Sequence, residues 1–216
     1  MKKNKPWKLF LIPFSVFVSI LILSKCNAAE KISSEIQWNS AGTNSISDYV
    51  CNGKGNTDNT SGCEAFNDLG LKPKTRNIDI GGGKYDQNTE YLKRKFHVQN
   101  YVYDPFNRSS IHNEQVLKLA KEKPFDTATS MSVLNVVNTQ KARLEHIQLM
   151  FDCLKKGGTA YFKVYPSNGT GKERYGKGWY QSDRGAKYYV NEVSQIFGHK
   201  NTVLLKEKDM IKAWKN

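Results

Sequence analysis

The stretch "NIDIGGGKYD" (Asn77–Asp86) has the pattern of a strand that ends in a glycine turn and leads into a helix. Its apolar residues Ile78 and Ile80 alternate with polar ones, which predicts a short strand over 77–80. A basic helix is predicted over 88–95. Glycine tolerates positive φ and lets the backbone approach a ligand closely, so three glycines in this position mark a turn that can hold one.

Downstream of this stretch, predicted strands and helices alternate, which indicates a parallel sheet with helices on both faces. No clear strand is found between Asp104 and Phe125. Gly157-Gly158 is expected to cap the helix predicted just before it, over 142–154. A loop is predicted over 166–178. The predicted strands are 97–104, 125–137 (running into a turn), 159–165 and two within 201–215 that form a hairpin, and the predicted helices are 111–123, 142–154 and 188–197.

Two classes of ligand fit the turn. A dinucleotide site requires G-x-G-x-x-G, and Gly81 and Gly83 fit this pattern, but Asp86 stands at the third position, where its carboxylate would repel a pyrophosphate. S-adenosylmethionine (SAM) carries a sulfonium and an ammonium, which suit the acidic Asp79 just before the turn. Asp104 closes the next strand, where an acid can accept both ribose hydroxyls. The second reading is favoured, while a purely structural turn stays open.

Five motifs together resemble a class I SAM-dependent methyltransferase over residues 76–215. They are "IDIGGGKYD", "YVYDPFNRS", "FDTATSMSVLNVV", "LKKGGTAYFKVY" and "WYQSDR". The resemblance is greatest to small phage and bacterial methyltransferase-like proteins with an SxVLNV fourth-strand motif. It implies an α/β fold, a Rossmann-like three-layer sandwich whose seven-stranded sheet is mostly parallel with a reversed last strand. It also implies SAM as the cofactor.

The resemblance assigns site residues by position. Tyr85 stands where the family often has a third glycine, so the pose of the cofactor stays open. The end of the fourth strand, which includes Met131, lies beside the methyl donor in the family, and Asn135 is a candidate to line the substrate site. The expected cofactor-binding residues are Asp79, Gly81, Gly83, Asp104, Ser130 and Ser132.

These features predict methyl transfer from SAM to an unidentified acceptor. The alternative is an exported, catalytically inactive methyltransferase fold that serves as a binding module. No residue is identified as a general base, because His112 and His146 fall on predicted helices and are more typical of surface or core histidines. The sequence has no CxxC motif or histidine cluster, so no metal site is predicted.

We expect the binding site for the methyl acceptor in the basic region 155–188. Eight basic and two acidic residues give this region a net charge of +6. Trp179, Tyr180 and Arg184 are candidate substrate residues, because aromatic and cationic side chains together can stack bases and hold phosphates. Nucleic acid or another anionic surface is therefore a possible partner, in line with the chain's net charge of +13. The alternative is that this region is a solvated loop without a role in binding.

The first 29 residues are typical of a targeting segment. Four lysines precede an apolar run over 9–23, which fits a signal peptide or an N-terminal membrane anchor. Either reading predicts that the protein is exported (periplasmic or secreted) or membrane-anchored with an extracytoplasmic domain, although SAM is made in the cytoplasm. A polar extension is expected over 30–75 and the catalytic domain over 76–216, and Cys51 and Cys63 could pair in an oxidising compartment.

Overall fold

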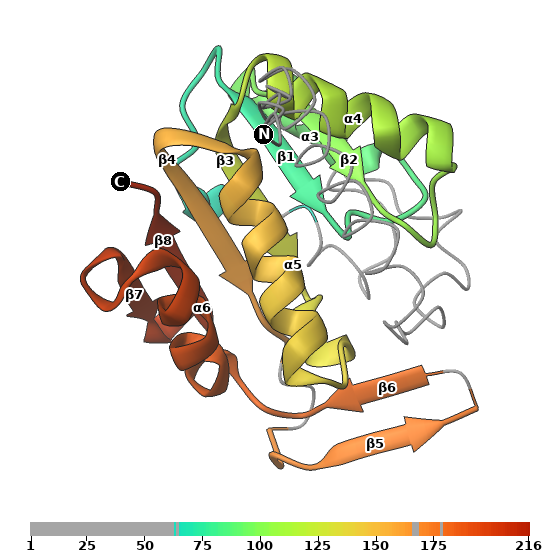
Figure 1. The fold of residues 1–216 in the computed structure, drawn as a ribbon, viewed down its shortest axis with the longest axis vertical. Coiled ribbons are helices and arrows are strands. Elements are labelled where there is room, and N and C mark those ends of the chain that lie inside the picture. Colours follow the sequence, from blue (N-terminus) through green and yellow to red (C-terminus); the bar gives the residue numbers. More distant parts are fainter. Residues whose placement is uncertain (1–62, 64, 166–168, 178) are drawn as a thin grey trace, which may run out of the picture. The chain divides into compact units, whose positions relative to one another are not determined.

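A computed structural model describes residue 63 and residues 65–165, 169–177 and 179–216. These residues form a six-stranded sheet in the order β2-β1-β3-β4-β8-β7 (Figure 1) and a separate two-stranded sheet, β5-β6. The strands of the large sheet are β1 (Arg76–Ile80), β2 (Gln99–Tyr103), β3 (Phe125–Met131), β4 (Leu154–Lys163), β7 (Thr202–Leu205) and β8 (Met210–Trp214).

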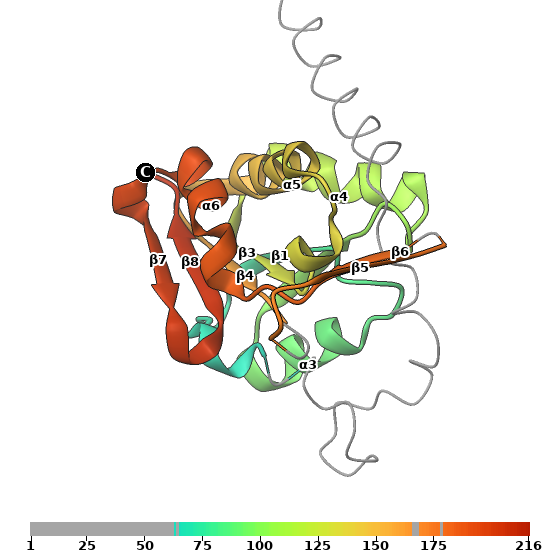
Figure 2. The same ribbon diagram turned by 90° about the horizontal axis from the view of Figure 1, so that it is seen from below.

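Helices cover both faces of the large sheet, as predicted. Figure 2 shows α4, α5 and α6 along one face and α3 on the other. The chain moves from β1 to β2 in one direction and then returns past β1 to β3, and right-handed crossovers place the two connecting helices on opposite faces. The helices are α3 (Gln87–Phe96), α4 (Ser110–Glu122), α5 (Gln140–Cys153) and α6 (Val190–Phe197).

The predicted mostly parallel sheet with a reversed last strand is confirmed. β1 pairs in parallel with β2 and β3, and β3 pairs in parallel with β4. β8 lies antiparallel between β4 and β7, and β7–β8 is the predicted terminal hairpin. The resemblance implied seven strands, whereas the large sheet has six in the described part of the chain. The seventh is missing between β2 and β3, where no strand pattern was found in the sequence and where α4 alone connects the two strands.

The prediction that Gly157-Gly158 caps a helix is wrong. Helix α5 ends at Cys153, and β4 begins at the next residue and runs through both glycines. The register of β3 against β4 shifts between Phe125 and Thr127, opposite this stretch. Gly157 has φ +74, and backbone bonds join the glycine pair to Lys215. The glycines therefore form a bulge in β4.

The loop prediction for 166–178 is also partly wrong. Glu173–Gly176 and Trp179–Ser182 form the antiparallel pair β5–β6. In sequence the hairpin follows the C-terminal end of β4. Its last strand packs against the short helix η4 (Leu134–Val136), which follows β3.

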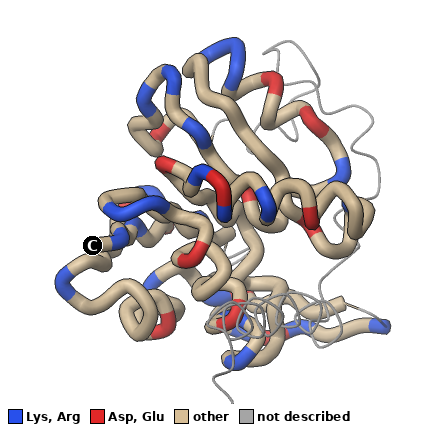
Figure 3. The backbone as a smooth tube through the Cα atoms, turned by 45° about the horizontal axis from the view of Figure 1, so that its top comes forward, with Lys and Arg blue, Asp and Glu red and all other residues tan. Residues whose placement is uncertain are grey.

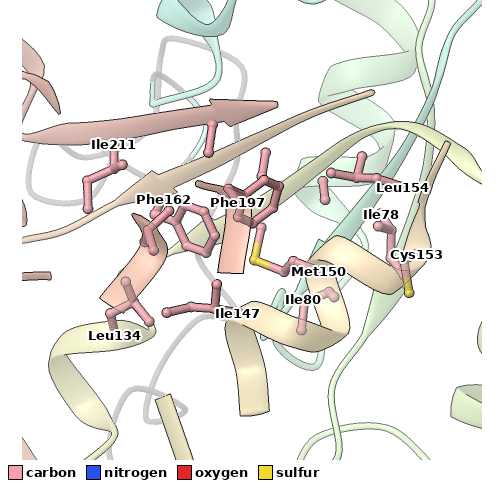
Figure 4. Packing of buried hydrophobic residues seen from close by; sticks show 14 of the residues in the cluster. Ile78, Ile80, Leu134, Ile147, Met150, Cys153, Leu154, Phe162, Phe197 and Ile211 are labelled. Atoms are coloured by element: carbon pink, nitrogen blue, oxygen red, sulfur yellow. The ribbon is translucent and has the colours of Figure 1, made fainter. Parts of the chain in front are cut away.

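The main core lies between the sheet and the helices α4, α5 and α6. Figure 4 shows Ile78, Phe162 and Ile211 from three strands meeting Ile147 and Met150 from α5. A second cluster lies on the side of the sheet that carries α3. There Phe66, Leu69 and Leu71 pack with Leu92 and Met210, so residues just before β1 contribute buried apolar surface.

The predicted N-terminal segment, including the apolar run 9–23, lies outside the described residues. Among the residues that are described, no helix is long and apolar enough to cross a membrane.

Candidate functional site

The reversal of strand order fixes the place where a ligand is expected. β2 lies on one side of β1 and β3 on the other, so the topological switch point lies between the C-terminal ends of β1 and β3. In open α/β sheets, ligands bind outside this point. Asp79 on β1, Ser130 on β3 and Ser132 just after β3 all belong to this edge of the sheet.

The glycine turn is tied down by backbone bonds. Gly81 and Gly83 have φ of +83 and +81, which side chains rarely tolerate. Gly81 N donates to Tyr103 O at 2.8 Å, and Gly83 N donates to Asp104 Oδ2 at 2.9 Å. A Cβ on Gly82 would stand 2.6 Å from Asp79 Oδ2. A side chain at Gly81 or Gly83 would strain the backbone, and one at Gly82 would force the Asp79 carboxylate to move.

Asp79 is buried, with a relative exposure of 1%. Its Oδ1 accepts a hydrogen bond from Thr129 Oγ1 at 2.8 Å, while its Oδ2 has no partner in the described structure. Burial raises the pKa of Asp79 to about 7, the bond from Thr129 opposes this, and the nearby Asp104 raises it further. A cationic or hydrogen-bond-donating ligand group would satisfy the free oxygen and favour the ionised form.

Thr129 is held as a donor to Asp79 by its own neighbours. Asn77 Nδ2 donates to Thr129 Oγ1 at 3.0 Å and to Asn100 Oδ1 at 2.7 Å. The single hydroxyl proton of Thr129 can go to Asp79 Oδ1 at 2.8 Å or to Ile78 O at 3.4 Å, and the shorter distance favours Asp79. A buried polar network below the turn thus orients the acid.

Asp104 closes β2 at the predicted position, and its carboxylate is largely used by the protein itself. Oδ1 accepts from the backbone N of Phe106 and Asn107 and from Asn107 Nδ2, at 2.9–3.2 Å. Oδ2 accepts from Gly83 N. Since a carboxylate offers about four acceptor positions, Oδ2 keeps capacity for a further donor. Asp104 therefore connects the glycine turn to the end of β2.

Asp86 makes an ion pair. Its Oδ1 lies 2.8 Å from Arg108 Nη2, and Arg108 Nε donates to Gly83 O at 2.9 Å. Asp86 therefore repels a pyrophosphate less than its charge alone suggests, because the Arg108 guanidinium compensates that charge. Arg108 instead joins the glycine turn to the segment after β2.

The residues predicted at the end of β3 differ in their surroundings. Ser130 is buried, and its Oγ lies 2.8 Å from His146 Nε2 on α5. Burial lowers the pKa of His146 to about 3, so the imidazole is neutral. Met131 is half-buried, and Ser132 is exposed with φ +60, an uncommon backbone conformation for a residue other than glycine.

Asn135 lies on η4 and is 1% exposed. Its Nδ2 donates to Tyr165 O at 3.1 Å, just beyond β4, so the amide bridges the segments that follow β3 and β4. Its Oδ1 is buried and has no partner in the described part of the chain. Asn138 Oδ1, one residue before the N-cap of α5, shares this property.

The substrate residues predicted on the hairpin are engaged in contacts within the protein. Tyr180 is 2% exposed and packs against Tyr175, with ring centroids 5.1 Å apart. Arg184 Nη1 lies 2.7 Å from Glu173 Oε1, and its guanidinium stacks over Tyr188. Trp179 is half-buried on β6. These contacts hold the hairpin together, and a role in binding substrate stays a prediction.

The basic character of 155–188 is also reduced by pairing. Lys155 pairs with Asp126, Arg174 with Asp183 and Arg184 with Glu173. Figure 3 shows Lys and Arg spread over several elements of the described chain, with Asp and Glu between them. Contact with nucleic acid or another anionic surface stays a prediction.

The sequence reasoning missed Gly82, Thr129 and Arg108. Gly82 stands inside the quoted motif but outside the G-x-G pattern. Thr129 lies opposite Asp79 in the register of β1 and β3, and pairing register is not readable from either strand alone. Cys63 is disulfide-bonded, while position 51, its predicted partner, lies outside the described residues. In the described ranges, no group of His, Cys, Asp and Glu could hold a metal ion.

Comparison with known proteins gives a family match. A family model described as a methyltransferase domain matches residues 59–196. No curated protein matches the chain.

Solved structures with a similar arrangement include the following three proteins, two of which are named as methyltransferases. DesVI of Streptomyces venezuelae is 12% identical, with 72% of this chain and 91% of that chain covered and a TM-score of 0.47. A SAM-dependent methyltransferase of Clostridium acetobutylicum is also 12% identical, with 74% and 94% covered and a TM-score of 0.44. Phosphoethanolamine N-methyltransferase 2 of Haemonchus contortus, in complex with SAM, is 19% identical, with 62% and 32% covered and a TM-score of 0.37.

Proposed function

The chain belongs to the methyltransferase domain family, with SAM as its cofactor, and we propose that it catalyses methyl transfer from SAM to an acceptor bound at the C-terminal edge of β3 and β4. The observation that carries the proposal is the turn at the switch point, where Asp79 keeps a buried, unpartnered oxygen beside three glycines. SAM supplies a methyl group already activated by a sulfonium.

The residues of the turn suit this cofactor. Asp79 Oδ2 would accept from the ammonium of the methionine part or from a water bound to it, and the remaining capacity of Asp104 Oδ2 would take a ribose hydroxyl. The absence of side chains at Gly81, Gly82 and Gly83 lets the ligand approach the backbone. The protein's task is then to align the acceptor with the methyl group and exclude water.

Calorimetric titration of the full chain with SAM and with S-adenosylhomocysteine tests the proposal. We expect saturable binding of both. Gly82→Val should abolish it, because the new Cβ would meet Asp79 Oδ2 at 2.6 Å. Gln115→Ala, on the exposed face of α4, serves as a control. Absence of both heat and a thermal shift at millimolar SAM would refute the proposal.

We further propose that the domain acts outside the cytoplasm, on the basis of the lysine-flanked apolar run 9–23. The proposal requires that SAM reaches that compartment. Fusing reporters that are active on only one side of the membrane to the C-terminus tests it. A fusion that is active only in the cytoplasm would contradict it.

A further inference from the structure

Asn135, on η4 after β3, is a buried polar side chain whose hydrogen bonding is incomplete. It is 1% exposed, and its Oδ1 has no hydrogen-bond partner among the described residues. The bond from Nδ2 to Tyr165 O fixes which way the amide faces, because only the NH2 group can donate to a carbonyl. The free atom is therefore an acceptor whose orientation is set by the protein.

A buried acceptor without a donor destabilises the native state, and a ligand that brings a donor relieves this cost. Asn135 lies between the ends of β3 and β4, on the short helix against which β6 packs. It follows the switch-point strand β3, at the same edge of the sheet as Asp79. Tyr165, whose carbonyl accepts from Asn135, has an exposed side chain, and so has Ser132 at the end of β3.

We propose that the methyl acceptor is a nitrogen atom that carries at least one hydrogen, and that Asn135 Oδ1 accepts the hydrogen bond from it. This rests on the proposed methyltransferase function and adds the chemical class of the acceptor. A neutral amine can donate its N–H to Asn135 and still present a lone pair to the methyl group. An alcohol is a weak nucleophile until a base takes its proton, and an amide oxygen is not such a base.

The transfer balances without any further reactant. The nitrogen lone pair forms the N–C bond while the S–C bond breaks with its electron pair remaining on sulfur, and the proton released from the methylated nitrogen passes to water. As nitrogen becomes positive, its N–H becomes a stronger donor. The bond to Asn135 Oδ1 therefore strengthens in the transition state, and Asn135 favours the reaction more than the binding of substrate.

The atom that receives the methyl group can be read directly. The full chain is incubated with SAM labelled with carbon-13 in the methyl group and an extract of the cells that express it. The carbon-13 chemical shift of each new methyl signal separates N-, O-, S- and C-methyl products. An N-methyl product is expected. An O-, S- or C-methyl product overturns this inference and leaves the proposed function standing, whereas absence of any new methyl signal overturns both.

Variants of Asn135 test its role with the same product. Asn135→Leu should lower kcat/KM by about tenfold to a hundredfold, while calorimetry shows unchanged affinity for S-adenosylhomocysteine. Asn135→Asp keeps an acceptor oxygen, so it should retain more activity than Asn135→Leu. This variant also tests the role of Asn135 if Asn135→Leu folds poorly. Gln140→Leu, which removes an exposed amide at the start of α5, is the matched control. Equal activity of Asn135→Leu and wild type overturns the role of Asn135.

Discussion

Asp79 has one hydrogen bond within the described structure, although a carboxylate can accept about four. The chain nevertheless buries it, near the end of β1 and just before the glycine turn. Natural proteins leave few buried polar atoms unpaired, so each such atom needs an explanation. Asp79, Asn135 and Asn138 supply all three such oxygens found among the described residues, and all three lie at the end of β1 or just after β3. This grouping agrees with a site that is completed by ligands.

Thr129 is expected to act on ligand binding through Asp79. Thr129→Val keeps the shape of the side chain but removes the hydroxyl that donates to Asp79 Oδ1 at 2.8 Å. Hydrogen bonds to charged groups are worth about 1.5–3 kcal/mol, so we expect SAM affinity measured by calorimetry to fall at least about tenfold. Thr129→Ser should restore it. If the valine variant binds SAM as wild type does, Asp79 does not depend on Thr129 for its orientation.

The pKa of Asp79 predicts how stability depends on pH in the absence of ligand. Burial raises it from 3.8 to about 7, so the native state keeps a proton that the unfolded chain releases. The contribution of Asp79 to the free energy of unfolding is complete below pH 3.8 and is lost as pH rises to about 7, amounting to about 2–4 kcal/mol. Urea unfolding at pH 5 and at pH 8 measures this. From pH 5 to pH 8, the free energy of unfolding should decrease less in Asp79→Asn than in wild type.

The same linkage applies to the cofactor. A cationic ligand beside Asp79 favours the ionised carboxylate, so SAM should bind more tightly at pH 8 than at pH 5.

For the stability prediction, an equal change of the free energy of unfolding with pH in wild type and in Asp79→Asn would contradict the titration assigned to Asp79.

Among the elements, α5 and α6 are joined by a buried ion pair. Arg143 Nε and Nη2 donate to the two carboxylate oxygens of Glu192, each at 2.8 Å, and Arg143 Nη1 donates to Val137 O. Both residues are nearly inaccessible to solvent. A pair in this position fixes how the two helices meet beside η4 and the hairpin.

Glu192→Leu is expected to destabilise the protein strongly. It leaves the Arg143 guanidinium buried without a carboxylate, which typically costs about 3–5 kcal/mol. Arg143→Leu combined with Glu192→Leu should be less unstable than Glu192→Leu alone, because no uncompensated charge remains. Urea unfolding of wild type, Arg143→Leu, Glu192→Leu and the double variant measures this. Additive losses would mean that the two side chains do not act as a pair.

The sequence predicted elements well where apolar periodicity is strong and less well where the backbone is irregular. α5 was expected at 142–154 and is found at Gln140–Cys153. Gly157-Gly158 was misassigned, because a glycine pair after a helix fits a cap as well as a bulge and only pairing with β3 and β8 decides. β5–β6 was missed because its Gly- and Lys-rich sequence lacks a strong strand pattern.

The candidate site, like the helices and strands, was predicted in part from the sequence. Asp79, Gly81, Gly83 and Asp104 lie together as expected, because they follow from the pattern of two adjacent strands. Tyr180 and Arg184 were singled out by residue type, which does not reveal that one is buried and the other is paired with Glu173. Contacts between distant segments, such as Asn135 with Tyr165, are set by the fold and carry no local signal.

At the scale of the whole domain, the order of strands in the sheet differs from their order in the chain. β8 follows β7 along the described chain, yet in the sheet it lies between β4 and β7. Its residues Met210, Ile211 and Ala213 are fully buried. The six-stranded sheet therefore cannot be completed without β8.

Removal of residues 210–216 should prevent folding, whereas removal of Asn216 alone should not. The longer deletion takes away the strand that pairs with both β4 and β7, and it exposes apolar surface of β4 and α6. It also removes Lys215, whose backbone bonds to Gly157 and Gly158 hold the bulge in β4. Asn216 is exposed, and its Nδ2 donates one hydrogen bond, to Asn201 Oδ1. Circular dichroism melts should show a cooperative transition for wild type and for the chain lacking Asn216, and none for the chain ending at Asp209. A cooperative melt of that chain, together with retained SAM binding, would mean that β1 to β4 form a stable sheet without the strand that borders them.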